Sequence, residues 1–392
     1  MINEKIAQAI SILNEKQIDA WLIFVRESHS LHDPSLELIL GAHCTWQSAF
    51  FISANGETIA IVGNLDAAAI RDAGAFKTVI PYTTSIRDEL LATFRKIDPK
   101  TIAINYSTNN YMADGLTHGM YMVLCDLLQG TDYPNRFISS EAIVSAIRGR
   151  KSPAELSHMK TAIRYTQAIF DQVTDYVRVG MTEQEIANFM KGEVEKRGLE
   201  VAWDPETCPS VFTGPDTAGA HYGPTSRKTA AGHIMNIDFG VKYNGYCSDM
   251  QRTWYFKRSN EKSVPEAVLK AFNTVRDAIE KAAGFLKPGV QGHEVDNVAR
   301  QYIIDQGFAE YPHGLGHQIG RAAHDGAGTL CPVWERYGNL PFLNVEQGQV
   351  YTLEPRVTCE GYGVATIEEE VVVTKDGCEF LSDPQRELYI IE

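Results

Sequence analysis

The chain has 392 residues, of which 44% are hydrophobic and 22% are charged, and a formal net charge of −14 at pH 7. This composition predicts a globular protein with room for two domains, and the excess of acids disfavours nucleic acid or an anionic membrane as a partner. No apolar run is long enough to span a membrane, and seven cysteines without a C-x-x-C pair favour a reducing, cytoplasmic setting.

Residues 1–148 predict a smaller α/β domain. An amphipathic helix leads into the strand-like AWLIFV, and Ala54-Asn55-Gly56 separates two apolar runs as a hairpin turn would. The runs TVIPY and TIAINY follow helix-like segments, so the alternation indicates a mixed sheet covered by helices. His43 and Trp46 could line a site, but a packed loop is the better explanation for them.

The segment 147–153 is charged, contains glycine and proline, and predicts a boundary between domains 1–148 and 149–392. Ser152 is a candidate cap for a helix that begins at Pro153 and carries Glu155 at its third position. Thr182 and Glu185 repeat this capping pattern at the start of the next helix.

The C-terminal part contains an internal repeat. Residues 180–199 align without a gap on residues 289–308, and the alignment pairs Glu185 with Glu294. An apolar hairpin that carries acids follows each copy. The pattern predicts a helix pair plus hairpin that is used twice, although two amphipathic helices can also resemble each other by chance.

The first hairpin is expected in residues 233–256, with Asn244-Gly245 as the turn. Counting back from the turn places Asp238 opposite Gln251 and makes Asp238 and Asp249 diagonal neighbours on one face. Two buried carboxylates repel each other and lose hydration, so they require a cation. The alternative is a pair of surface acids that flank a turn.

The second hairpin is expected in residues 350–374. With its loop centred on Gly361, Glu354 and Glu368 lie directly opposite each other on one face. Glu370 shares that face farther along the strand and is the second choice to Glu368, whereas Glu369 points away.

Histidines form a cluster between the two hairpins. His313, His317 and His324 lie within twelve residues, among glycines that permit close backbone approach. His221 precedes the first hairpin, where a loop would pass over the site. A solvated histidine-rich loop is the simpler alternative.

The order of the segments IDFG, YCSD, GHQIG, LEPR and TIEE resembles the pita-bread metallopeptidase family, which includes methionine aminopeptidase, aminopeptidase P, prolidase and creatinase. The similarity covers residues 152–392, and the N-terminal domain resembles that of the aminopeptidase P, prolidase and creatinase branch. The resemblance implies an α+β protein in which a pita-bread catalytic domain, a duplicated helix-hairpin, follows a smaller α/β domain. It also implies a homodimer.

The resemblance implies five metal ligands, which are Asp238, Asp249, His317, Glu354 and Glu368. Such an oxygen-rich set suits two divalent cations, with Mn²⁺ as first choice and Co²⁺, Fe²⁺ or Zn²⁺ as alternatives. Two such ions lower the pKa of water and polarise a carbonyl. Glu354 would also take the proton from the water, His324 or His221 would stabilise the oxyanion, and His313 would help protonate the leaving amine.

The expected function is hydrolysis of short peptides after the N-terminal residue, of the Xaa-Pro aminopeptidase or dipeptidase type. Four residues depart from the family pattern near the ligands: Gln318, Asp325, Arg356 and Thr366. Arg356 could replace an arginine that proline-specific members often carry where this chain has Thr366. The alternatives are the same fold used on a small non-peptide substrate, as a lyase or amidinohydrolase-like enzyme, and a metal-free binding module.

Overall fold

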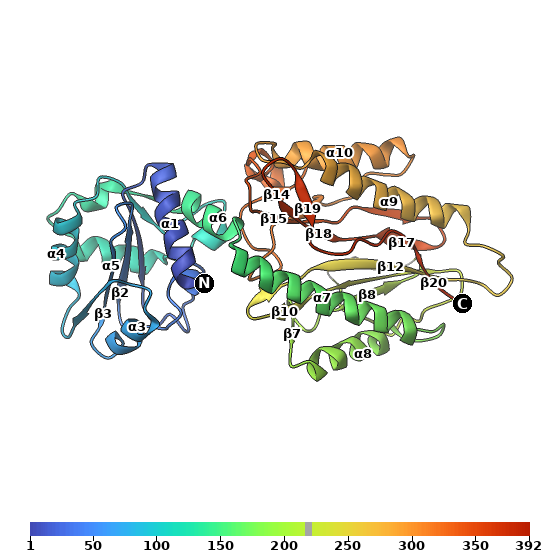
Figure 1. The fold of residues 1–392 in the computed structure, drawn as a ribbon, viewed down its shortest axis with the longest axis horizontal. Coiled ribbons are helices and arrows are strands. Elements are labelled where there is room, and N and C mark those ends of the chain that lie inside the picture. Colours follow the sequence, from blue (N-terminus) through green and yellow to red (C-terminus); the bar gives the residue numbers. More distant parts are fainter. Residues whose placement is uncertain (216–221) are drawn as a thin grey trace. The chain divides into compact units, whose positions relative to one another are not determined.

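The computed structural model describes residues 1–215 and 222–392, and its ribbon is drawn in Figure 1. The chain divides into two compact units, Met1–Arg148 and Gly149–Glu392. In the described ranges, no helix is both long and apolar enough to cross a membrane.

The N-terminal unit is built on a six-stranded mixed sheet with the order β4-β3-β2-β1-β5-β6. Its strands are β1 (Ala20–Val25), β2 (Ser48–Ser53), β3 (Thr58–Gly63), β4 (Thr78–Tyr82), β5 (Ile102–Ile104) and β6 (Phe137–Ser139). Its helices are α1 (Ile2–Lys16), α2 (Leu36–Ile39), α3 (Ala67–Ala73), α4 (Arg87–Ile97), α5 (His118–Leu127) and α6 (Glu141–Gly149), with short 3₁₀ turns at Tyr111–Ala113 and Tyr133–Arg136.

Apolar side chains on both faces of the central strands explain why helices cover this sheet. Strands β1, β2 and β3 are buried along their whole length. The β2–β3 hairpin turns at Asn55-Gly56, where Gly56 has a φ of +86° that favours glycine. The predicted mixed sheet with packed helices is therefore confirmed.

The described part of the C-terminal unit contains four long helices and a set of short sheets. The helices are α7 (Pro153–Tyr176), α8 (Glu183–Lys196), α9 (Glu266–Phe285) and α10 (Gly292–Asp305). The strands of its first half are β7 (Glu200–Val201), β8 (Ser210–Thr213), β9 (Ile234–Phe239), β10 (Val241–Tyr243), β11 (Tyr246–Cys247) and β12 (Met250–Phe256).

The strands of the second half are β13 (Gly316–His317), β14 (Thr329–Leu330), β15 (Val350–Leu353), β16 (Arg356–Cys359), β17 (Gly363–Thr366), β18 (Glu369–Val373), β19 (Cys378–Phe380) and β20 (Tyr389–Ile391). Short 3₁₀ turns occur at Glu335–Tyr337 and Leu340–Phe342.

The predicted duplication is visible in the helices. Both α8 and α10 have 14 residues and begin with a capping box, from Thr182 to Glu185 and from Gln291 to Glu294. Gly180 and Gly289 precede them with the same φ of +92°. Shared caps, lengths and entry turns are more than two amphipathic helices would share by chance.

The repeated helix pairs form the two outer layers of the C-terminal unit. Helices α7 and α8 pack on β8, β9 and β12 through one apolar core, and α9 and α10 pack on the second set of strands through another. Figure 1 shows the two helix pairs on opposite sides of the strands. The two sets of strands meet where Gln251 of β12 forms an isolated bridge with Glu368.

A buried ion pair holds this seam together. The Arg252 guanidinium lies 3.0 Å from a Glu369 carboxylate oxygen, and both side chains are almost fully buried. Arg252 also donates to the carbonyl oxygen of Glu368, and Glu369 accepts from Ser382 and from the backbone N–H of Gln385. Glu369 thus points away from the Glu368 face, as the strand alternation predicts.

We expect Glu369→Gln to destabilise the C-terminal unit by about 3–5 kcal/mol, because it leaves the Arg252 charge buried without a counter-charge. Urea unfolding followed by tryptophan fluorescence measures the change. Glu379→Gln on the exposed face of β19 is the matched control and should change stability by less than about 0.5 kcal/mol. Equal stability of the two variants would show that the pair does not hold the seam.

Candidate metal centre

The first hairpin has the predicted register and an interruption that was not predicted. Tyr243 pairs with Tyr246, and Asp238 pairs with Gln251. Between these ladders, a Cβ on Gly240 would overlap the carbonyl oxygen of Ser248, so only glycine fits this close approach. The hairpin is therefore split between two sheets, and Asp249 lies in the break.

The second hairpin also has the predicted register. Cys359 pairs with Gly363 and Leu353 pairs with Glu369, so both ladders are centred on Gly361. Glu354 and Glu368 consequently face each other in the gap between the ladders. Glu370, the second choice in this hairpin, accepts a hydrogen bond of 2.9 Å from the backbone N–H of Asp249.

His317 reaches the two hairpins from β13, which lies beside β15. A Cβ on Gly316 would overlap the Thr352 carbonyl oxygen, so glycine is needed for this approach. The His317 Nδ1 lies 3.3 Å from the Gln318 carbonyl oxygen, which can only accept a hydrogen bond, so Nδ1 carries the proton of the neutral ring and Nε2 is unprotonated. The His317 Nε2 lies 3.4 Å from Glu354 Oε1, 3.8 Å from Asp249 Oδ2 and 3.9 Å from Glu368 Oε1.

Burial and mutual repulsion disturb every carboxylate of this cluster. Burial raises the pKa of Asp238 to about 7, against a hydrogen bond from Asp249 that lowers it. Burial and then the charge of Glu368 raise the pKa of Asp249. Burial and neighbouring carboxylates likewise raise the pKa values of Glu354 and Glu368, and burial raises the pKa of Glu370 to about 8.

The donor set fits divalent cations. Ligand atoms of Asp249, His317 and Glu368 all lie within 4.8 Å of one another. Among the described residues, Asp238 Oδ1 and Glu368 Oε1 are buried and have no hydrogen-bond partner. Lone pairs that are buried and unused next to an imidazole nitrogen are what a bound cation would satisfy.

The structure brings the other predicted histidines to different places. The ring centroids of His324 and His317 are 4.1 Å apart, so His324 lies against the cluster. His313 places its Nδ1 2.8 Å from the carbonyl oxygen of Gly314, which fixes the proton of the neutral ring on Nδ1. His221 lies outside the described residues.

Gln251 belongs to the cluster, although the sequence did not single it out. Its amide nitrogen lies 2.9 Å from Glu368 Oε2 and 3.5 Å from Glu354 Oε2, so it orients two carboxylates. The signal was its place two residues after Asp249, on the same face of the strand. Because an amide carries no charge, the sequence alone did not mark Gln251 as a member of the site.

A second unpredicted feature fixes the loop that carries His313. Asp296 and Arg300 of α10 form a buried ion pair with an N–O distance of 2.7 Å, and Arg300 donates to the carbonyl oxygens of Tyr311 and His313. Asp296 accepts from the N–H of Leu315. The signal was an acid and an arginine four residues apart on a helix, which is usually a surface pair.

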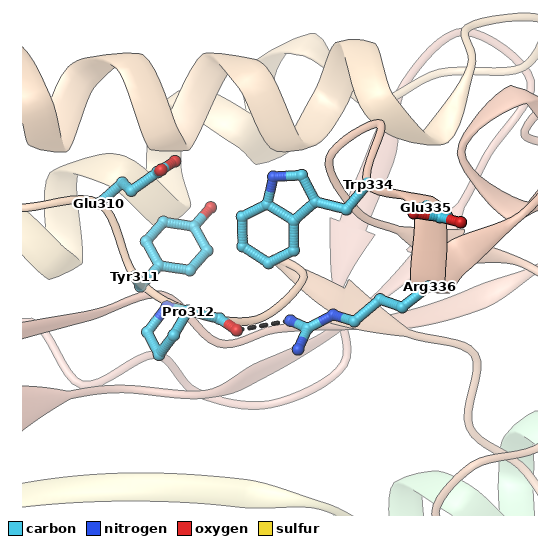
Figure 2. A pocket seen from close by; sticks show the side chains of 6 residues that line it. All are labelled: Glu310, Tyr311, Pro312, Trp334, Glu335 and Arg336. Atoms are coloured by element: carbon cyan, nitrogen blue, oxygen red, sulfur yellow. Dashed lines mark hydrogen bonds between the residues drawn. The ribbon is translucent and has the colours of Figure 1, made fainter.

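Arg336 completes this support. It donates to the carbonyl oxygen of Pro312 at 2.6 Å, and the guanidinium carbons of Arg300 and Arg336 lie 5.0 Å and 4.7 Å from the Trp334 ring centroid. Two arginines at one indole thus bind three successive carbonyls of the histidine loop. A pocket of about 880 Å³ lies next to this support, and Figure 2 shows the side chains that line it. Its lining residues are Glu310, Tyr311, Pro312, Trp334, Glu335 and Arg336.

Two of the four departures from the family pattern stabilise the turn after His317. Gln318 is buried, and its amide nitrogen donates to the Tyr351 hydroxyl at 3.1 Å. Asp325 accepts from the backbone N–H of Arg321 at 2.6 Å. These contacts explain Gln318 and Asp325 without a change of substrate.

Sequence comparison matches residues 157–375 to a model of metallopeptidase family M24. An uncharacterized peptidase of Staphylococcus haemolyticus is 30% identical over 241 residues, which are 61% of this chain and 64% of that protein. A Staphylococcus aureus peptidase is 30% identical over 250 residues, 63% and 66% of the two chains. The alignments thus span less than two thirds of these curated relatives.

Solved structures share the fold over nearly the whole length. An X-Pro aminopeptidase from Thermotoga maritima superimposes with a TM-score of 0.72 at 26% identity, over 98% of this chain and 99% of that chain. An Xaa-Pro dipeptidase from Bacillus anthracis superimposes with a TM-score of 0.75 at 24% identity, over 99% of each chain. At 24% identity, the similarity to the Bacillus anthracis structure is a similarity of fold alone.

Metal-free protein should lose thermal stability as the pH rises from about 5 to about 8. The folded pKa values of Asp238, about 7, and Glu370, about 8, exceed their unfolded values of about 3.9 and 4.3. Such acids contribute stability that is complete below the unfolded pKa and is lost as the pH rises through the folded pKa.

A divalent cation binds the ionised carboxylates, so the gap in melting temperature between Mn²⁺-loaded and chelated protein should widen over this pH range. Calorimetry at several pH values measures both curves. A gap that stays constant from pH 5 to pH 8 would contradict the proposed ionisation of these groups.

Arg300→Met should destabilise the protein by about 3–5 kcal/mol, because it leaves the buried Asp296 carboxylate unpaired. Arg336→Met removes only an exposed contact and should cost less than about 1 kcal/mol. Denaturant unfolding of both variants provides the comparison. Equal costs would refute the view that the buried pair is the main support of the loop.

Proposed function

Since the chain belongs to metallopeptidase family M24, we propose that it is a dinuclear metal-dependent exopeptidase that hydrolyses the bond after the N-terminal residue of short Xaa-Pro peptides. The observation that carries the proposal is the meeting of two hairpins and one histidine strand, which brings carboxylate oxygens of Asp249, Glu354 and Glu368 within 4 Å of the His317 Nε2. The fourth carboxylate, Asp238, is hydrogen-bonded to Asp249. The likeness to an X-Pro aminopeptidase at 26% identity supports the substrate class.

In this proposal, five side chains hold two divalent cations. Asp238 would hold one ion, His317 and Glu354 would hold the other, and Asp249 and Glu368 would serve both. When bound, the ions supply Lewis acidity that polarises a peptide carbonyl and lowers the pKa of water. We propose Mn²⁺ because hard oxygen donors dominate the set, with Co²⁺, Fe²⁺ or Zn²⁺ as alternatives.

The protein's own groups move the protons. Glu354 takes the proton of the attacking water, and Gln251 orients its carboxylate from 3.5 Å. His324, next to His317, donates to the oxyanion. His313 holds its Nδ1 proton toward the Gly314 carbonyl, which leaves Nε2 as the nitrogen that exchanges a proton with the leaving amine.

The proposal also includes a cellular location, the cytoplasm. All seven cysteines are free, which fits a reducing cytoplasm. The proposed homodimer comes from the family resemblance.

A peptide panel tests the proposal. Mn²⁺-loaded protein should cleave peptides with an Ala-Pro N-terminus faster than those that begin with Ala-Ala or Met-Ala. Asp249→Ala and His317→Ala should bind less Mn²⁺ and fall to the background rate while they retain their circular dichroism spectrum. His118→Ala on the exposed start of α5 is the control and should behave as wild type.

Full activity in Asp249→Ala or His317→Ala would refute the ligand assignment. Metal-loaded protein that cleaves none of the peptides would contradict the peptidase and favour the same fold acting on a small non-peptide substrate.

A further inference from the structure

Arg356 is the departure from the family pattern that has no structural use. Its cross-strand partner Thr366 is engaged, because the Thr366 hydroxyl lies 3.2 Å from both Gln251 Oε1 and the Pro355 carbonyl oxygen. Among the described residues, the Arg356 guanidinium makes no hydrogen bond, ion pair or ring contact.

The strand register places Arg356 on the face of the candidate centre. Val357 and Cys359 lie on one face of β16 and pack into the core beneath α9. Arg356 therefore faces the other way, as does the exposed Thr358. Directly across from Arg356, Thr366 contacts Gln251, which orients Glu368 and Glu354. This face is thus continuous with the carboxylate cluster.

An unpaired guanidinium at this depth is unusual in this protein. Arg356 is half-buried. The more deeply buried arginines each have a carboxylate partner, as in the pairs Arg148 with Glu37, Arg252 with Glu369 and Arg300 with Asp296. Burial of a charge without a partner costs stability, so the missing counter-charge is expected from a ligand.

We propose that Arg356 is a specificity-determining residue that binds the C-terminal carboxylate of a dipeptide substrate. The inference rests on the proposed function and narrows it from exopeptidases in general to a dipeptidase. A guanidinium suits this role because it can donate two parallel hydrogen bonds to one carboxylate. The terminal carboxylate of the substrate would supply the counter-charge that the half-buried guanidinium lacks.

The spacing fits a dipeptide. Arg356 follows Glu354 by two residues, which is about 6–7 Å of extended strand. A dipeptide has one residue after its scissile bond, about 3.3–3.6 Å of chain, and the long arginine side chain can reach back over the difference. A longer peptide places an uncharged amide where the dipeptide has its carboxylate.

The test compares Ala-Pro with Ala-Pro amide and Ala-Pro-Ala on Mn²⁺-loaded protein. Wild type should prefer Ala-Pro by about 10- to 100-fold in kcat/KM, which is the worth of a charge-assisted hydrogen bond. In Arg356→Met this preference should collapse toward one, mainly through a higher KM for Ala-Pro. Arg356→Lys, which keeps the charge, should give an intermediate preference, and Arg386→Met on the surface should keep the wild-type ratio.

Thermal unfolding adds a readout independent of turnover. A guanidinium that serves only a ligand should leave Arg356→Met at least as stable as wild type, whereas a structural role predicts a lower melting temperature. A lower melting temperature, or a wild type that cleaves Ala-Pro and its amide equally well, would overturn the role of Arg356 while the peptidase stands. Cleavage of none of these peptides would overturn the proposed function and this inference with it.

Discussion

Repulsion among buried carboxylates is the constraint on which the C-terminal unit depends. Asp238, Asp249, Glu354 and Glu368 come from two hairpins, and burial raises the pKa of each. Such a cluster is costly unless cations or protons offset its charge. The surrounding structure therefore has to hold the carboxylates together against their repulsion, and its rigid supports can be understood in that way.

Three supports surround the cluster. The seam between the hairpins is closed by the Gln251–Glu368 bridge and by the buried pair of Arg252 with Glu369. Strand β13, which carries His317, lies in close contact with β15 at Gly316. The loop before it is held by Arg300 and Arg336 through three backbone carbonyls. The arginines of these supports bind backbone carbonyls or carboxylates outside the cluster, Glu369 and Asp296, so they hold the ligands in place without pairing with the four clustered carboxylates.

The same charges bear on substrate choice. Two bound divalent cations would neutralise the four carboxylates, so a further cation beside them would favour a substrate that carries a free carboxylate. Gln318 and Asp325 are used to stabilise the turn after His317, and Thr366 is bonded to Gln251. Arg356 is therefore the altered residue through which this chain could select its substrate by charge.

The sequence by itself determined the elements whose signals are local. Capping boxes located α7 and α8, Asn244-Gly245 and Gly361 set the registers of both hairpins, and the repeated helix pattern revealed the duplication. The family resemblance supplied the fold and the proposed ligand set, and the model match and the solved structures confirmed the fold.

Only the tertiary structure decided how these elements meet. The break at Gly240, the role of Gln251, and the carbonyl contacts of Arg300 depend on atoms that are far apart in the chain. Local patterns encode turns and faces, because backbone conformation depends on near neighbours. They do not encode which distant carbonyl oxygen an arginine will bind. They also do not encode which arginine will be left without a partner.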